Sequence, residues 1–392
     1  MKTFINYLFF EKAMDAILLA GQGDDKQKLT IDGKRVSKQS LGLGGKFLFE
    51  WPLEALVEAE SVDRVFVVGS GPELGQVILG KYAPLVNQGK VVPIPDQGSL
   101  MQNVGISYFV DHLTRINNLE TPLPELVKRA RIFQANNKLH SNMVQRTPAL
   151  RDDKKLIVPY DMACLTAEQV DHFIQELVDP TADIEIGLGD VGLGKKKFKE
   201  DLDLKLFDND HKLSGSYSDG QLIRLGLITA SYFAAPPTIN SLIEHMYRNR
   251  HMKDGTGDGS FKLGKSLKFT QGILMAGTKY LKSLPKYSPE LGKESLTLRA
   301  LQLCLFFTNQ KKTELTGGII LGPDGLRRTL PSRAVIEDVA TYFAGGATVK
   351  FAYSDNPLML GPVIDVDCVR TYQDLVANDN HARIRNYLKK VA

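Results

Sequence analysis

The chain has 392 residues, of which 43% are hydrophobic, so it is long enough to bury one large core or two smaller ones. Its 49 basic and 45 acidic residues are interspersed, which argues against a nucleic-acid-binding protein. Three widely spaced cysteines suggest neither a disulfide framework nor a zinc site, and they fit a reducing, cytoplasmic location best. The apolar run at residues 7–10 is too short for a membrane span or a signal peptide, and we take residues 1–13 as an N-terminal extension.

The first predicted strand, residues 16–20, is an apolar run that breaks at once into Gly21, Gln22 and Gly23. A parallel α/β sheet binds its ligands beyond the carboxyl ends of its strands, so this glycine loop is a candidate phosphate site. Lys38 and Lys46 follow, before a predicted helix at residues 48–59. Their ammonium groups would add positive charge to the backbone amides of the loop.

This stretch resembles the MobA-like NTP transferases, the molybdenum-cofactor guanylyltransferase-like family with the nucleotide-diphospho-sugar transferase (GT-A) fold. The family pattern reads roughly LAGGxGxR, then xK, then GKPMIEYVLEAL. The chain has LAGQG at residues 19–23, SK at 37–38 and GKFLFEWPLEAL at 45–56, so a glutamine replaces one glycine and the usual arginine is missing. The resemblance implies nucleotide binding by Leu19, Ala20, Gly21, Gln22, Gly23, Lys38 and Lys46.

Strands and helices then alternate along the chain. Strands are predicted at residues 63–69 and 90–94, and helices at 74–80 and 100–113. This alternation is typical of a doubly wound, mostly parallel α/β sheet.

The helix at residues 100–113 begins after Ser99, which is placed to cap it. The segment QGSLMQNV at residues 97–104 also resembles the family's GDSLxENL. By that resemblance Ser99 and Asn103 would face the base or the ribose of the nucleotide. The two interpretations of Ser99 are compatible, and both stay open.

A basic helical stretch at residues 126–134 is interpreted as part of a surface excursion. A buried strand follows at residues 155–159 and ends just before Asp161, so a carboxylate lies at the ligand-binding edge of the sheet. Thr166 is placed to cap the next helix. The segment resembles the family's SDIPLLTPEAID, in which the aspartate binds the catalytic divalent cation. The alternative is that Asp161 only stabilises its own loop.

Residues 187–192 spell GxGxxG after a predicted strand at 182–187. The residues that follow are basic and then acidic, unlike the apolar helix of a dinucleotide site, so we predict a glycine-rich substrate loop instead. The basic cluster is interpreted as a solvated loop or as a contact to an anionic substrate; it comprises Lys195, Lys196, Lys197 and Lys199.

The domain boundaries predicted from these patterns are a nucleotidyltransferase-like α/β core at residues 14–262, a helical insertion at 263–330 and a C-terminal part of the core at 331–392. Asp365 and Asp367 resemble the family's closing DIDTPEDL. The resemblance implies that one of them completes a Mg²⁺ or Mn²⁺ site with Asp161. Two or three uncompensated carboxylates would then lie close together, and residues 364–366 would lie in or beside the sheet of the first strand.

The function that the resemblance implies is Mg²⁺-dependent transfer of an NMP group from an NTP to a phosphorylated or hydroxyl acceptor, with release of pyrophosphate. Lys38, expected at the surface, and Asp161 are the predicted catalytic residues. The predicted partners are an NTP and a small phosphorylated acceptor, without nucleic acid or membrane, and an oligomer is compatible with the sequence. One alternative is a catalytically degenerate nucleotide-binding or regulatory protein, suggested by the altered glycine loop. Another is a GT-A glycosyltransferase, suggested by the DxD-like pair Asp365 and Asp367.

Overall fold

The structure is a computed structural model. It describes residues 13–21, 29–116, 121–135, 153–204, 215–216, 222–231, 319–321, 327–329, 337, 341, 348–366 and 369–392.

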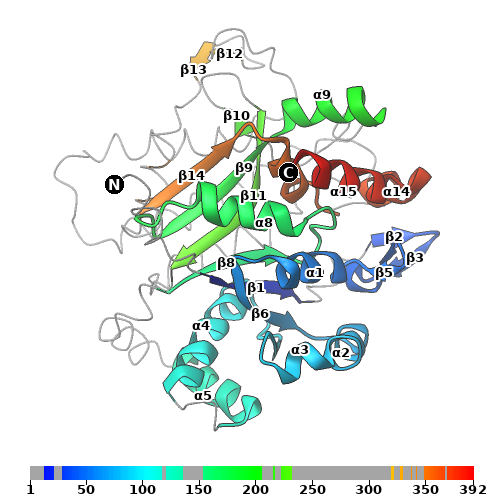
Figure 1. Ribbon diagram of the computed structural model, residues 1–392. Coiled ribbons are helices and arrows are strands. Elements are labelled where there is room, and N and C mark those ends of the chain that lie inside the picture. The colour runs from blue at the N-terminus through cyan, green and yellow to red at the C-terminus, as the bar shows by residue number, and fades with distance from the viewer. Residues whose placement is uncertain are drawn as a thin grey trace, which may run out of the picture.

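The centre of the protein is a mixed, mostly parallel sheet (Figure 1). Seven of its strands form one path, in the order β14 (Val349–Ser354), β9 (Ile184–Asp190), β11 (Leu222–Ser231), β8 (Lys154–Pro159), β1 (Met14–Ala20), β6 (Val62–Gly69) and β7 (Val91–Pro95). Strand β11 runs antiparallel to both of its neighbours, and the short β10 (Gly215–Ser216) pairs with it. The remaining pairs in the path are parallel. The predicted α/β class with a mostly parallel sheet is confirmed.

Short strands and helices surround this sheet. Three small hairpins are β2 (Leu29–Ile31) with β3 (Lys34–Val36), β4 (Gly42–Leu43) with β5 (Lys46–Phe47), and β12 (Ile319–Leu321) with β13 (Arg327–Thr329). The described α-helices are α1 (Glu50–Glu58), α2 (Pro72–Leu79), α3 (Ala83–Asn87), α4 (Leu100–Ile116), α5 (Leu123–Ala135), α8 (Ala167–His172), α9 (Val191–Leu202), α14 (Val369–Val376) and α15 (Asn380–Val391). The 3₁₀ segments are η2 (Lys38–Ser40), η5 (Pro357–Val363) and η6 (Ala377–Asp379), and η3 (Phe173–Leu177) is a π-helical segment. None of the described helices is long and apolar enough to cross a membrane.

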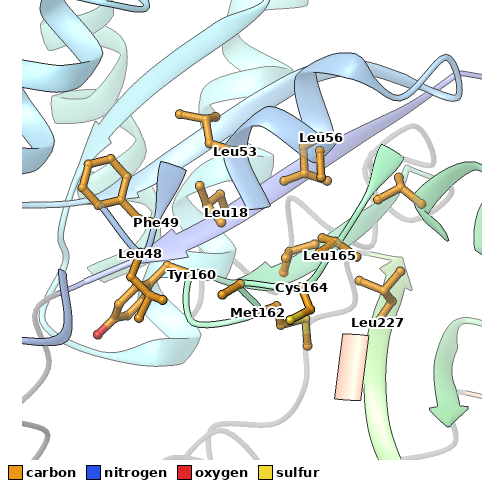
Figure 2. Close-up of a cluster of buried hydrophobic side chains, with 14 of the residues drawn as sticks. Leu18, Leu48, Phe49, Leu53, Leu56, Tyr160, Met162, Cys164, Leu165 and Leu227 are labelled. Atoms are coloured by element: carbon orange, nitrogen blue, oxygen red, sulfur yellow. The ribbon is translucent and has the colours of Figure 1, made fainter. Parts of the chain in front are cut away.

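Hydrophobic residues cover both faces of the sheet, because consecutive side chains of a strand point to opposite faces. In β1, Ala16 and Leu18 belong to the larger buried cluster, whereas Ile17 belongs to the second cluster, which is built on α4 and α5. Figure 2 shows Leu18 in the larger cluster with Leu53 and Leu56 of α1. The apolar run at residues 16–20 of β1 is therefore required by burial on two sides.

An ionic cluster lies under α4, near the amino ends of β1 and β8. Lys155 is fully buried, and its Nζ lies 3.0 Å from Asp15 and 2.6 Å from Asp111. Arg64 contacts the same two aspartates at 2.6 and 2.5 Å. We call this set the ionic cluster; its members are Asp15, Arg64, Asp111, Arg115, Asp153 and Lys155. The second residue of β8 is thus a buried lysine, whereas the sequence indicated only a buried strand at residues 155–159 and no ionic partners for it.

The C-terminal segment packs on the same core. Strand β14 pairs in parallel with β9, and the backbone N–H of Val366 donates to the Asp161 carbonyl at 3.0 Å. Residues 364–366 form no strand, but this bond places them beside the chain that leaves β8. Helix α15 contributes the buried His381, which bonds to the Ala163 carbonyl at 2.9 Å. Its ring packs edge-to-face with Trp51 of α1, with the ring centroids 4.4 Å apart.

The substrate loop predicted at residues 187–192 is wrong, and so is the loop predicted for the basic cluster, whose contact to an anionic substrate stays a prediction. Strand β9 continues to Asp190 and α9 begins at Val191, so residues 187–192 form no substrate loop and the basic cluster lies on a helix. The glycines serve packing, since a Cβ on Gly189 would lie 2.7 Å from the Met359 carbonyl oxygen of η5. The Asp190 side chain caps α9 by accepting from Leu193 N at 2.9 Å.

Within the predicted helical insertion, residues 263–330, the described residues are those of β12 and β13, which are strands. The rest of the insertion, and residues 1–12 of the predicted extension, lie outside the described residues.

Candidate active site at the carboxyl edge of the sheet

The two predicted catalytic residues are in contact. Lys38 Nζ lies 3.2 Å from Asp161 Oδ2, although 123 residues separate them in the sequence. Lys38 is 2% exposed and Asp161 is 7% exposed. Lys38 is therefore not the surface residue that the sequence suggested, and Asp161 is not an uncompensated carboxylate. Buried lysine–carboxylate pairs occur both in structural ion-pair networks and in sites that bind charged ligands, so the position of this pair decides its interpretation.

The sheet explains why Asp161 lies where it does. The pairing of β1 with β8 aligns Leu19 with Pro159, and the Tyr160 N–H continues the ladder by donating to the Leu19 carbonyl at 3.2 Å. The next residue, Asp161, therefore emerges beside the end of β1, where the glycine loop starts. Asp161 thus has the position at the carboxyl edge that its place after a buried strand predicts.

Lys38 reaches this edge from η2, a single 3₁₀ turn. The next residue of the turn, Gln39, is fully buried and donates from its Nε2 to the Ala20 carbonyl at the end of β1. Ser40, the last residue of the turn, donates to Glu73 Oε1 of α2 at 3.0 Å. Gln39 and Ser40 were not predicted as site residues, because their partners lie far away in the sequence.

Gly21 lies against the loop that follows β7. A Cβ on Gly21 would lie 2.9 Å from Asp96 Oδ2 and 3.6 Å from Asn103 Nδ2, so no larger residue fits without a shift. Asn103 donates to Asp96 Oδ1 at 3.0 Å and accepts from Gln97 N at 2.7 Å. Asn103 thereby organises the loop between β7 and α4. Asp96, the first polar residue after β7, is a site candidate that the sequence analysis missed.

Ser99 occupies the start of α4. Its Oγ accepts from Gln102 N at 3.3 Å, and its carbonyl accepts from Asn103 N at 2.9 Å. The structure therefore gives Ser99 the capping role that the sequence predicted. No contact in the described structure bears on its predicted role toward the nucleotide.

Lys46 lies on β5 and is held away from the Lys38–Asp161 pair. Its Nζ donates to Glu54 of α1 and lies 4.4 Å from the centroid of the Trp51 ring. Burial by itself would raise the pKa of Glu54, but the hydrogen bonds from Lys46 and Lys81 lower it overall. Lys46 is thus engaged in packing α1, and the structure does not bring it together with Lys38.

The predicted metal ligands are only partly described. Asp365 is half-buried and directly precedes Val366, whose N–H bonds to the Asp161 carbonyl. Asp367, like Gln22 and Gly23 of the glycine loop, lies outside the described residues. Among the described side chains, no group of three His, Cys, Asp or Glu residues could hold a metal ion. This result is compatible with Mg²⁺, which is commonly held by one or two carboxylates together with substrate phosphates and water. Asp161 offers a carboxylate to a cation, but the Lys38 ammonium already offsets its charge, so a cation would compete with Lys38 for it.

Comparisons with known proteins give only distant structural likenesses. No family model and no curated protein matches the chain. A hypothetical transferase from Thermus thermophilus is 16% identical, with a TM-score of 0.45 over 93% of this chain and 100% of that one. A 4-diphosphocytidyl-2C-methyl-D-erythritol synthase from Anaerococcus prevotii is 10% identical, with a TM-score of 0.33 over 97% of each chain. CMP:2-keto-3-deoxy-manno-octonic acid synthetase in complex with CTP is 12% identical, with a TM-score of 0.32 over 68% of this chain and 99% of that one. At these TM-scores the likenesses assign no family to the chain.

Proposed function

We propose that this protein is a nucleotidyltransferase that moves an NMP group from an NTP to a phosphorylated or hydroxyl acceptor and releases pyrophosphate. The observation that carries the proposal is the contact between Lys38 and Asp161 at the carboxyl edge of β1 and β8. This edge is where an α/β sheet binds its ligands, and the glycine loop of the MobA-like resemblance starts at the same place. The membership in that family is part of the proposal.

The chemistry requires few groups from the protein. The acceptor oxygen attacks the α-phosphorus, a new P–O bond forms, and the bond to the bridging oxygen breaks, so that pyrophosphate leaves with the electron pair. Catalysis of phosphoryl transfer depends mainly on positioning and on neutralising negative charge. Lys38 would supply its ammonium to the triphosphate. Its burial strengthens that interaction, because the charges attract more strongly when water is excluded.

Asp161 would hold the divalent cation, together with Asp365 or Asp367. When bound, Mg²⁺ would neutralise triphosphate charge and orient the α-phosphate. The Asp161 carboxylate would pair with Lys38 in the free protein and with the cation once it is bound, since both are positively charged. Asp96 and Asn103 would face the nucleoside part of the substrate, because they lie beside Gly21 at the carboxyl end of β1.

The proposal is tested by measuring pyrophosphate release with each of the four ribonucleoside triphosphates, against a set of phosphosugars and phosphoalcohols, with and without Mg²⁺. The parent protein should release pyrophosphate with one NTP and one class of acceptor. Lys38→Met and Asp161→Asn should abolish this release. Lys90→Met is the matched control, because Lys90 is a half-buried lysine that donates to the Val62 carbonyl near the start of β6, away from this edge.

The same screen separates the alternatives. A degenerate binding protein would bind an NTP in calorimetry but release no pyrophosphate with any acceptor. A glycosyltransferase would release a nucleoside diphosphate from a nucleotide-sugar and would leave NTPs intact. Either result would refute the proposed function.

A further inference from the structure

The turn η2 connects three neighbouring parts of the sheet edge through three consecutive side chains. Lys38 contacts Asp161 after β8, Gln39 contacts Ala20 at the end of β1, and Ser40 contacts Glu73 of α2, which follows β6. Strands β8, β1 and β6 are adjacent in the sheet, in that order. The turn therefore lies across the edge, with one side chain for each strand.

The turn cannot hold this position through its own backbone. Its local backbone hydrogen bonds are Ser40 N to the Ser37 carbonyl at 3.1 Å and Leu41 N to the Lys38 carbonyl at 3.2 Å. A 3₁₀ turn of this length has poor intrinsic stability, so outside contacts must fix it. Of the side chains of η2 other than Lys38, Gln39 is the fully buried one.

The orientation of the Gln39 amide is determined by its partner. The Ala20 carbonyl can only accept, so the Gln39 nitrogen must face it. The Gln39 Oε1 atom is buried and has no hydrogen-bond partner among the described residues. A buried acceptor without a partner lowers stability, so the amide is a poor choice for stability alone. Such a departure from the rules of stability is expected at functional sites.

We propose that Gln39 is a positioning residue: by anchoring η2 to the end of β1 it holds Lys38 where the triphosphate binds. Lys38 has a long, flexible stem, and placing its ammonium requires that its backbone be fixed. The anchor on Ala20 sets the distance between Lys38 and the start of the glycine loop, which the triphosphate must bridge. This inference rests on the proposed function, since it assigns the anchor to an NTP site.

The test is a double-mutant cycle in NTP affinity, measured by titration calorimetry with Mg²⁺ and the NTP that the screen selects. The variants are Gln39→Met, Lys38→Met and the combination of both. Gln39→Met should weaken NTP binding about 10-fold in the parent background, the effect of one lost hydrogen bond. In the Lys38→Met background the same change should weaken binding less than about 2-fold, because Gln39 acts through Lys38.

Gln169→Met is the matched control. Gln169 is also fully buried, but both of its amide atoms are bonded: Nε2 donates to the Leu358 carbonyl at 2.6 Å and Oε1 accepts from Thr166 N at 2.8 Å. We expect the control to lower the unfolding midpoint and Gln39→Met to leave it nearly unchanged, since only Gln39 has an unpaired oxygen to lose. In the cycle, the effect of Gln169→Met on NTP affinity should be the same with and without Lys38.

Two results would overturn the inference while leaving the proposed function intact. One is an NTP affinity that Gln39→Met does not change although Lys38→Met weakens it. The other is a Gln39→Met effect of equal size in both backgrounds, which would make Gln39 merely structural. A parent protein that binds no NTP would overturn the proposed function and this inference with it.

Discussion

Lys155→Met is expected to destabilise the protein strongly while leaving its proposed NTP site intact. The ionic cluster contains three positive groups, Lys155, Arg64 and Arg115, and three negative ones, Asp15, Asp111 and Asp153. Removal of the lysine leaves two positive charges against three carboxylates, in a place where Lys155 has no exposed surface.

The magnitude follows from burial. Breaking a buried ion pair by removing one partner costs about 3–5 kcal/mol, because the other charge stays buried without compensation. Methionine keeps most of the stem of the lysine, and with it the packing near Phe66 and Tyr108, whose ring centroids lie 5.2 and 5.3 Å from Nζ. We therefore expect the low end, about 3 kcal/mol at pH 7.

The pH dependence provides a second check. Burial would raise the pKa of Asp111, but the attraction of Lys155 and the neighbouring arginines lowers it overall. A carboxylate with a depressed pKa stabilises the fold above its unfolded pKa, and that stability is lost as the pH falls through the folded value. Without Lys155 the pKa of Asp111 rises, so this carboxylate takes up a proton at a higher pH. The difference in stability between parent and variant should therefore shrink toward acid pH.

The assay is urea unfolding followed by circular dichroism, at pH 7 and at pH 4, with NTP affinity measured on the folded variant. Adding Asp153→Asn to Lys155→Met should recover part of the loss, since it restores the balance of two positive and two negative groups. The reasoning is refuted if Lys155→Met is as stable as the parent within about 0.5 kcal/mol, the size of an ordinary surface change. A loss that does not vary with pH would refute the electrostatic explanation.

Three further predictions concern other parts of the structure. Burial lowers the pKa of His381 to about 4, so as the pH falls the unfolded chain binds a proton at this side chain before the folded protein does, and the protein loses stability. His381→Gln should therefore reduce the loss of unfolding free energy between pH 7 and pH 4 by up to about 3 kcal/mol. Gly189→Ala should lower the unfolding free energy by roughly 1–3 kcal/mol, because its Cβ would clash with η5. Gly75→Ala on α2 has open space around the new Cβ and should raise the unfolding free energy by up to about 1 kcal/mol. An unchanged unfolding free energy in Gly189→Ala would contradict the packing role of Gly189. Lys46→Met should weaken NTP binding in calorimetry much less than Lys38→Met, because Lys46 is held by α1. An equal loss of NTP affinity in the two variants would show that Lys46 also binds the triphosphate.

The sequence alone predicted the strands that form the centre of the sheet. Residues 16–20, 63–69 and 155–159 were predicted as buried strands, and the structure has β1, β6 and β8 at these places. Long apolar runs are a strong signal because a strand covered on both faces is mostly apolar. The glycine motif at residues 187–192 led to a wrong prediction, because the sequence does not distinguish a glycine that allows close packing from one that makes room for a phosphate.

The positions of Lys38 and Asp161 at one edge also followed from the sequence, since each comes after a strand predicted to lie in the same sheet. Their contact did not follow. An ion pair across 123 residues depends on the register of β1 with β8 and on the path of η2, and neither leaves a local signal. Gln39 was missed for the same reason, because its partner is a backbone carbonyl that any residue could supply.

Local chemistry thus determined which segments are strands, which residues end them and where charge could meet a ligand. The tertiary structure decided what those residues touch: that Lys38 is buried against Asp161, that Lys46 pairs with Glu54, and that Lys155 near the start of β8 is balanced by aspartates. The physical reason is that hydrophobic periodicity depends on residues that are close in the sequence, whereas the partner of a buried charge depends on how the whole chain folds.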